Sequence, residues 1–221
     1  MVSTADAKRH AAKITRQLAK HYPDATCSLD FRSPLELLVA TILSAQCTDS
    51  RVNQVTQTLF PKYPTVSHYA RANLSELEQD IRSTGFFRSK AKNIQKCCEI
   101  LLERHGGKVP EKMEQLVELP GIGRKTANVV LSTAFGIAVG VAVDTHVARI
   151  ARRLGLSREK SPEKIERDIL EQVAKKQWLK LSHRLIQHGR RCCTARKPHC
   201  VECPLGSFCP RIGVEGKPSR A

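Results

Sequence analysis

Four cysteines near the C-terminus have the spacing in this sequence that is most typical of metal chemistry. Cys193, Cys200, Cys203 and Cys209 form the pattern C-x6-C-x2-C-x5-C. The pattern contains one C-x2-C pair, whereas a zinc ribbon usually has two such pairs well separated. A [4Fe–4S] cluster takes four thiolate ligands and suits one continuous, irregular loop. The spacing therefore favours an iron–sulfur cluster, with a zinc site or four uncoordinated cysteines as alternatives. The adjacent Cys192 offers a second candidate for the first ligand.

A second segment, L-P-G-I-G-R-K-T, is typical of phosphate binding. Pro120 is expected to end one helix and Arg124 to begin the next, so that Gly121 and Gly123 lie in the turn. We expect both glycines to turn the backbone with positive φ and to leave its N–H groups uncovered. Those N–H groups and the following helix N-terminus predict an anion site for one phosphate. This is a helix–hairpin–helix, which binds the DNA backbone without reading its sequence.

Lys125 and Asp144 are the candidates for chemistry near this turn. Lys125 falls in the first turn of the expected helix, where it either binds phosphate as an ordinary lysine or acts as a nucleophilic amine. At a pKa of about 10.4, only about one lysine in 2,500 is neutral at pH 7. A helix N-terminus contributes about 0.3–1 kcal/mol, so burial and the neighbouring Arg124 would have to add to it. Asp144 is expected to cap a helix with one carboxylate oxygen while the other faces a cleft.

The elements that must position these residues are predicted to be helices. Ser33 and Ser75 each begin a capping-box pattern, and both are expected to be N-caps. Only 139–143 could form a short strand, and the best candidate for a domain boundary is 136–140. We therefore predict an all-α protein. Further helices are predicted over 88–105, 111–118, 124–135, 145–154, 162–174 and 178–188.

Composition restricts the partner and the compartment. The chain has 221 residues, 41% of them hydrophobic, and a net charge of +16 from 37 Lys and Arg against 21 Asp and Glu. This excess makes a polyanion such as nucleic acid, or an anionic membrane, the natural partner. The sequence has no apolar run of membrane-spanning length and no signal-peptide core at its N-terminus, so we expect neither insertion nor secretion. The N-terminal segment is instead expected to be a surface helix that buries Ile14 and Leu18.

Several motifs in order resemble the endonuclease III family of DNA glycosylase/AP lyases, over about residues 8–210. The resemblance implies two helical lobes with DNA bound in the cleft between them. A six-helix domain with the hairpin would cover 26–137, and an iron–sulfur domain would combine 1–25 with 138–221. The motifs are S-A-Q-x-T-D at 44–49, S-K-A-x-N-I at 89–94, L-P-G-x-G-R-K-T-A-N-V-V-L at 119–131, V-D-T-H at 143–146 and H-G-R at 188–190.

The resemblance also implies a reaction and its catalytic residues. The substrate would be double-stranded DNA with an oxidised pyrimidine or an abasic site, cleaved on the 3′ side by β-elimination. Lys125 would be the nucleophile, facing Asp144 across the cleft, and Asp144 would assist. Gln46 would fill the space that the damaged nucleotide leaves. Phe86 stands where many relatives have a leucine wedge, which puts the lesion and opposite-base preference in doubt.

The remaining implied residues bind DNA or the [4Fe–4S] cluster. The resemblance selects Cys193 over Cys192 as the first cluster ligand, with Cys200, Cys203 and Cys209 as the others. It also implies a monomer that works in the cytoplasm at the nucleoid. The backbone-binding residues would be Gly121, Gly123, Arg124 and Thr126 in the hairpin and Arg190, Arg196 and Lys197 around the cluster loop.

Two other functions fit parts of the sequence. One is a monofunctional glycosylase of the same superfamily, directed at adenine or mismatches. Such relatives carry an acidic residue four positions before the Gln-x-Thr, where this chain has Ile42, and typically lack the hairpin lysine. The other is a damage-sensing DNA-binding protein without chemistry, against which the presence of both Lys125 and Asp144 argues.

Overall fold

The computed structural model describes residues 3–214, and its regular structure within that range is entirely helical. The prediction of an all-α protein is confirmed. The ends of the predicted iron–sulfur domain, residues 1–2 and 215–221, lie outside the described residues. The helices are α1 (Thr4–His21), α2 (Pro34–Leu43), α3 (Asp49–Lys62), α4 (Val66–Ala70), α5 (Leu74–Asp80), α6 (Phe87–His105), α7 (Met113–Val117), α8 (Arg124–Ala134), α9 (Thr145–Arg153), α10 (Pro162–Gln172) and α11 (Trp178–Arg191), with short 3-10 turns at Arg82–Thr84 and Lys175–Gln177.

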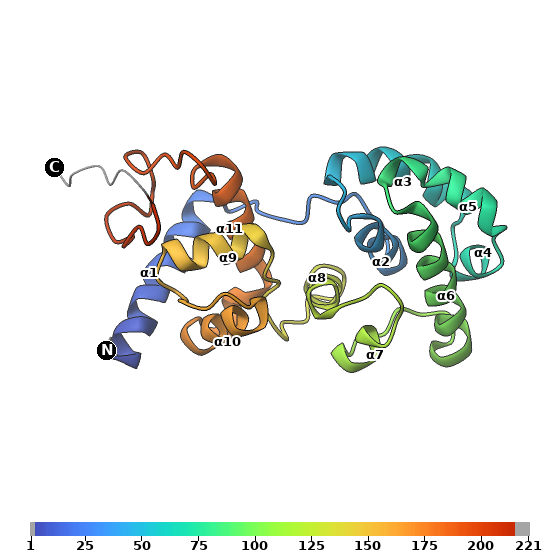
Figure 1. Ribbon diagram of the computed structural model, residues 1–221. Helices are drawn as coiled ribbons and strands as arrows, with labels where there is room; N and C mark the ends of the chain where they lie inside the picture. The colour runs from blue at the N-terminus through green and yellow to red at the C-terminus, as the bar shows by residue number, and fades with distance from the viewer. Residues whose placement is uncertain (1–2, 215–221) are drawn as a thin grey trace. The chain divides into compact units, whose positions relative to one another are not determined.

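The helices belong to two compact units (Figure 1). The hairpin unit is Cys27–Ile137 and contains α2 to α8. The cysteine unit combines the described residues up to Thr26 with those from Ala138 onwards, and contains α1 and α9 to α11. Each unit has its own apolar core, so each can hold its functional side chains in place by its own packing.

Helix α2 is the centre of the hairpin unit. Ser33 caps it by accepting a hydrogen bond from the Glu36 N–H, and Pro34 occupies the first turn, as the capping box predicts. The segment Leu37–Leu43 is buried throughout because α3, α6 and α8 all contact α2. Helix α6 also packs against α4 and α5 (Figure 1), which ties the start of α6 to the rest of the core.

Two expectations about helices in this unit were wrong or incomplete. Ser75 is not an N-cap, because α5 begins two residues earlier and Asn73 caps it by accepting from the Glu76 N–H at 3.2 Å. The earlier start brings Leu74 against the core together with the fully buried Leu77. Sequence reasoning also left out α3 and α4. The buried residues of α3, from Val52 to Leu59, have ordinary helical spacing, so this signal was present.

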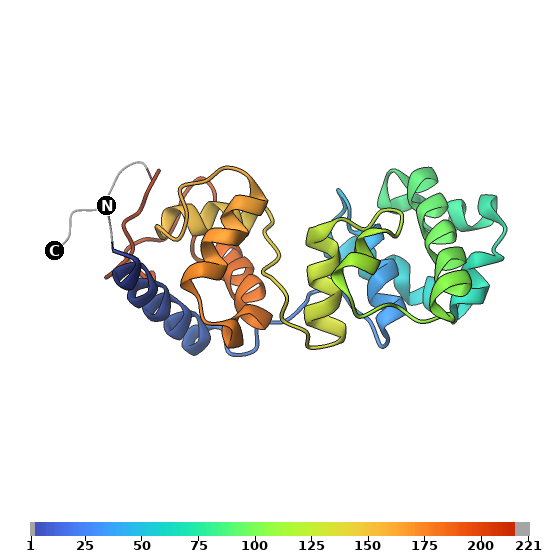
Figure 2. The same ribbon diagram turned by 90° about the horizontal axis from the view of Figure 1, so that it is seen from below.

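The cysteine unit is built around α9, which contacts α10 and α11, while α1 lies against α10 and α11 (Figure 2). Ile14 and Leu18 are fully buried, as the N-terminal stripe predicts. A Cβ on Gly189 would lie 2.6 Å from Ile150 Cδ1, so the glycine of the H-G-R motif permits the close approach of α11 to α9. No described helix has the length and apolar character needed to cross a membrane.

Candidate functional site

The turn of the helix–hairpin–helix lies between α7 and α8, and its two glycines differ. Gly121 has φ +79°, and a Cβ there would lie 3.0 Å from Asn93 Nδ2 of α6, so both conformation and packing require glycine. Gly123 has φ −90° and ψ 173°, which is extended backbone that any residue adopts. The expectation of positive φ at Gly123 was therefore wrong. Packing within the protein does not require glycine there either, because nothing lies within 4 Å of a Cβ built at Gly123.

Gly123 is the N-cap of α8, and no side chain caps this helix end. Helix α8 has 11 residues, so its N-terminus carries the partial positive charge of a full macrodipole. Arg124 and Lys125 follow at once and are exposed, while Thr126 is half-buried. A helix N-terminus of this kind is the feature from which the sequence predicts a phosphate site. In the free chain Lys125 is exposed, so the described protein atoms do not bury it.

Gln46 and Phe86 both lie in turns of the hairpin unit with left-handed backbone. Gln46 has φ +52° and is exposed, in the turn between α2 and α3. Phe86 has φ +49°, precedes α6 and is 66% exposed, whereas Phe87 packs against the core. A bulky residue with positive φ is an outlier that persists only where the surroundings hold it, and such outliers cluster at functional sites. This backbone could not be predicted from residue type, because neither residue is Gly, Asn or Asp.

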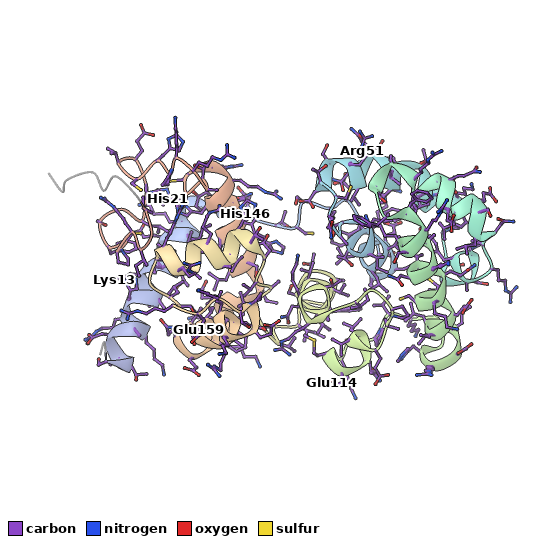
Figure 3. All side chains as sticks on the ribbon, in the orientation of Figure 1. Lys13, His21, Arg51, Glu114, His146 and Glu159 are labelled. Atoms are coloured by element: carbon purple, nitrogen blue, oxygen red, sulfur yellow. The ribbon has the colours of Figure 1, made fainter. Side chains whose placement is uncertain are left out.

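Asp144 begins α9 in the cysteine unit. Its Oδ1 accepts the Val147 N–H at 2.8 Å, so the predicted N-cap is present. The preceding residues Val141–Val143 are buried and belong to no regular element, so the β-strand considered for 139–143 is not formed. Instead of pairing with a strand, the Val141 N–H donates to Glu166 Oε1 at 3.1 Å. Asp144 itself is half-buried. It lies at the start of α9, the helix on which Figure 3 labels His146.

The four predicted cluster ligands line one cavity of the cysteine unit. Cys193, Cys200, Cys203 and Cys209 border it together with Cys192, and none of these thiols is in a disulfide. Four free thiols around one cavity fit the donor set that a [4Fe–4S] cluster requires.

The tightest group of ligand atoms in the described residues differs from the predicted set. Atoms of His188, Cys192 and Cys203 lie within 4.8 Å of one another. His188 Nδ1 is hydrogen-bonded to the Tyr22 hydroxyl at 3.0 Å. This bond to α1's C-cap residue holds the imidazole in place beside Cys192 and Cys203. Burial raises the pKa of Cys203 to about 12, and a bound metal's positive charge would favour the thiolate instead.

Helix α9 binds the loop from Cys193 to Cys209, which we call the cysteine loop, through two arginines that sequence reasoning missed. Arg149 Nη2 donates to the Cys193 carbonyl at 3.2 Å. Arg153 is 8% exposed and donates to the carbonyls of Thr194 and Ala195 at 2.6 and 2.7 Å. The helix that Asp144 caps therefore also fixes the start of the cysteine loop. Their spacing on α9 is an ordinary basic helix pattern, so only the tertiary contacts identify them.

The predicted basic residues around this loop are on the surface. Arg190, Arg196 and Lys197 are all exposed. The Lys197 carbonyl accepts a hydrogen bond from Thr194 Oγ1 at 2.6 Å, which closes a tight turn around Arg196. Exposed basic side chains of this kind attract a polyanion.

The chain is similar to known proteins over most of its length. Residues 39–175 match the model of the HhH-GPD superfamily base excision DNA repair protein, and residues 193–209 match the iron–sulfur binding domain of endonuclease III. Endonuclease III of Synechocystis sp. is 53% identical over 206 residues, which cover 93% of this chain and 94% of that protein.

Two solved structures are also similar to the chain. A non-covalent endonuclease III–DNA complex matches with a TM-score of 0.88 and 47% identity, covering 96% of this chain and 97% of that one. A trapped endonuclease III–DNA covalent intermediate, described as an estranged-adenine complex, has a TM-score of 0.88 and 46% identity over the same shares.

Proposed function

Because this chain belongs to the endonuclease III family of HhH-GPD base excision DNA repair proteins, we propose that it removes oxidised pyrimidines from duplex DNA with Lys125 as nucleophile and Asp144 as the assisting carboxylate. The protein is a DNA glycosylase with AP lyase activity. The observation that carries the assignment is the position of Lys125, exposed beside an uncapped helix N-terminus that fits a phosphate. An amine at this place is beside the DNA backbone and within reach of its sugar.

Lys125 carries the covalent steps of the proposed reaction. Its neutral amine attacks C1′ of the damaged nucleotide, the C1′–N bond breaks, and the base leaves with the bonding electrons and takes up a proton. Opening of the sugar ring leaves a Schiff base between Lys125 and C1′. Loss of a proton from C2′ then expels the 3′ phosphate by β-elimination, and water releases the lysine. Because Lys125 is exposed in the free protein, the bound nucleotide has to cover it and exclude water.

Asp144 supplies negative charge to the same nucleotide. Its Oδ1 is used by the cap of α9, which fixes the carboxylate on a rigid helix end. Its other oxygen stabilises the positive charge that develops on the sugar as the base leaves, or accepts the lysine proton. The side chain thus combines its local structural role with catalysis.

Gln46 and Phe86 replace the nucleotide that leaves the stack. Extrusion of a nucleotide costs a few kcal/mol, and side chains that fill the gap offset this cost. We assign Gln46 to the vacated space and Phe86 to the estranged base on the opposite strand. The large exposed fraction of Phe86 and the left-handed backbone of both residues support this role, because both are presented to solvent rather than to the core.

A [4Fe–4S] cluster is bound in the cysteine loop, and we propose Cys193, Cys200, Cys203 and Cys209 as its ligands. The iron–sulfur match begins at residue 193 and ends at 209, which favours Cys193 over Cys192. When bound, the cluster ties four points of the loop together.

Each phosphate that the basic residues neutralise should add about −0.9 to the slope of log K against log salt. The basic residues are Arg190, Arg196 and Lys197 near the cluster and Arg124 in the hairpin, whereas Gly121, Gly123 and Thr126 bind the backbone without carrying charge.

The proposed assembly is one chain on duplex DNA. Both catalytic side chains, both inserted side chains and the cluster loop come from a single copy, so no second subunit is needed. We propose that the protein works as a monomer in the cytoplasm at the nucleoid, where chromosomal DNA is.

A monofunctional glycosylase is the main competing function. Its acidic residue would stand at the position of Ile42, which is 3% exposed and belongs to the core of the hairpin unit. An end-labelled duplex that contains one oxidised pyrimidine distinguishes the bifunctional enzyme from a monofunctional glycosylase and from a damage sensor. Our proposal predicts strand cleavage without further treatment. A monofunctional enzyme would leave an intact abasic strand that breaks only in hot alkali. A damage sensor would change the electrophoretic mobility of the duplex by binding it, without forming any product.

A further inference from the structure

Lys90 is a buried lysine in the hairpin unit that the proposed reaction does not use. Its side chain extends from the first turns of α6, and the residue is only 4% exposed. Nζ donates to the Leu43 carbonyl and to the Thr84 carbonyl, each at 2.8 Å. In the part of the chain that the structure describes, no carboxylate pairs with it. A buried cation held by main-chain carbonyls alone has its position set by the backbone it binds.

The Leu43 carbonyl belongs to the last residue of α2. The last carbonyls of a helix lack intrahelical donors and carry the negative end of the macrodipole. Helix α2 has no basic residue in its own last turn, so the ammonium of Lys90 supplies both the donor and the charge from another helix. Directly beyond Leu43 the chain enters the turn that presents Gln46.

The second carbonyl lies at the start of the turn that presents Phe86. Thr84 is followed by Gly85 with φ +70° and by Phe86 with φ +49°. The backbone N–H of Lys90 also donates to the Phe86 carbonyl at 3.1 Å. Lys90 therefore binds the backbone on both sides of the left-handed residues, through its side chain before them and through its amide after them.

We infer that Lys90 is a positioning residue that fixes the Gln46 turn and the Phe86 turn relative to each other, so that both side chains enter one DNA duplex together. The inference rests on the proposed roles of Gln46 and Phe86. Left-handed backbone at two residues other than glycine is retained only if surrounding contacts hold it. Lys90 is one group that contacts both turns, and its rigid placement keeps the spacing between them constant.

The test compares two substrates of the same enzyme. Excision of an oxidised pyrimidine from a duplex needs both inserted side chains, because the base must leave a stack. β-Elimination at an abasic site in single-stranded DNA has no stack to open and needs neither. Lys90→Met keeps most of the apolar stem and removes the donors. We expect it to lower excision from the duplex by about 10²-fold, the effect of a misplacement of about 1 Å, while single-strand cleavage stays within about threefold of wild type.

Lys96→Met is the matched control, because Lys96 lies on the same helix with its side chain 61% exposed and paired to Glu99 on the surface. It should cleave both substrates like wild type. Circular dichroism establishes that each variant is folded at the assay temperature. If Lys90→Met does not fold, Lys90→Gln takes its place, since its shorter amide can still donate to one carbonyl. It should show a smaller loss with the same preference for single strands.

Equal loss on both substrates by a folded variant would overturn the inference and make Lys90 a general stabiliser. Unchanged excision from the duplex would overturn it as well. Neither result affects the proposed function, which depends on whether the wild-type protein excises the base and cleaves the strand.

Discussion

Substitution of Asp144 separates its structural role from its chemical role. The carboxylate accepts the Val147 N–H at 2.8 Å as the cap of α9, and we propose that it also stabilises charge on the sugar. Asp144→Asn keeps a carbonyl oxygen of the same shape for the cap and removes the charge. Asp144→Ala removes both. The two variants therefore share the chemical defect and differ in the structural one.

The expected magnitudes follow from the geometry of the cap. Asn is about as good an N-cap as Asp, so Asp144→Asn loses at most the charge–dipole interaction, about 0.3–1 kcal/mol. Asp144→Ala also loses the hydrogen bond and should cost about 1–2 kcal/mol. Folded domains are stable by about 5–15 kcal/mol, so both variants stay folded at 25 °C. Loss of a catalytic carboxylate should lower base excision by about 10²–10⁴-fold in both.

The assay pairs single-turnover excision with denaturant unfolding for wild type, Asp144→Asn and Asp144→Ala. The account predicts that the Asn variant unfolds closer to wild type than the Ala variant does, and that its excision is as weak as that of the Ala variant. Excision by Asp144→Asn near the wild-type rate, with only the Ala variant impaired, would refute the reasoning. Asp144 would then be an N-cap and nothing more.

Further predictions test the packing of both units and the contacts that hold the cysteine loop. Gly189→Ala should lower the free energy of unfolding by about 1–3 kcal/mol in denaturant titration, because its Cβ would lie 2.6 Å from Ile150 Cδ1. Arg153→Met removes the donor to the carbonyls of Thr194 and Ala195 in the cysteine loop, so the broad visible absorption of the cluster should decay faster than in wild type. Burial raises the pKa of Cys97 to about 12 and raises that of Cys98, so iodoacetamide at pH 8 should leave both unmodified in the folded protein, as mass spectrometry can determine.

Local sequence signals predicted most helix ends but not every cap. Ser33 caps α2 because Pro34 and Glu36 both favour a helix start there. At α5, Asn73 and Ser75 each stand three residues before a glutamate, and only packing of Leu74 selects Asn73. The helical class followed from periodicity, which depends on local spacing alone.

Candidate site residues can be proposed from the sequence where a residue type and its spacing are sufficient for the proposed role. Cysteine spacing and the hairpin lysine needed no tertiary information. The roles of Lys90, Arg149 and Arg153 did, since each binds carbonyls far away in the chain. The left-handed backbone at Phe86 was equally hidden, because an aromatic residue does not favour it and the surrounding contacts must impose it.

The central claim is that Lys125 forms a covalent bond with the sugar. Borohydride reduction during the reaction with DNA containing an oxidised pyrimidine converts the Schiff base into a stable amine. The account predicts one covalent protein–DNA adduct, mapped by mass spectrometry to Lys125 and absent in Lys125→Ala. No adduct with the wild-type protein, or an adduct of unchanged yield in Lys125→Ala, would contradict it.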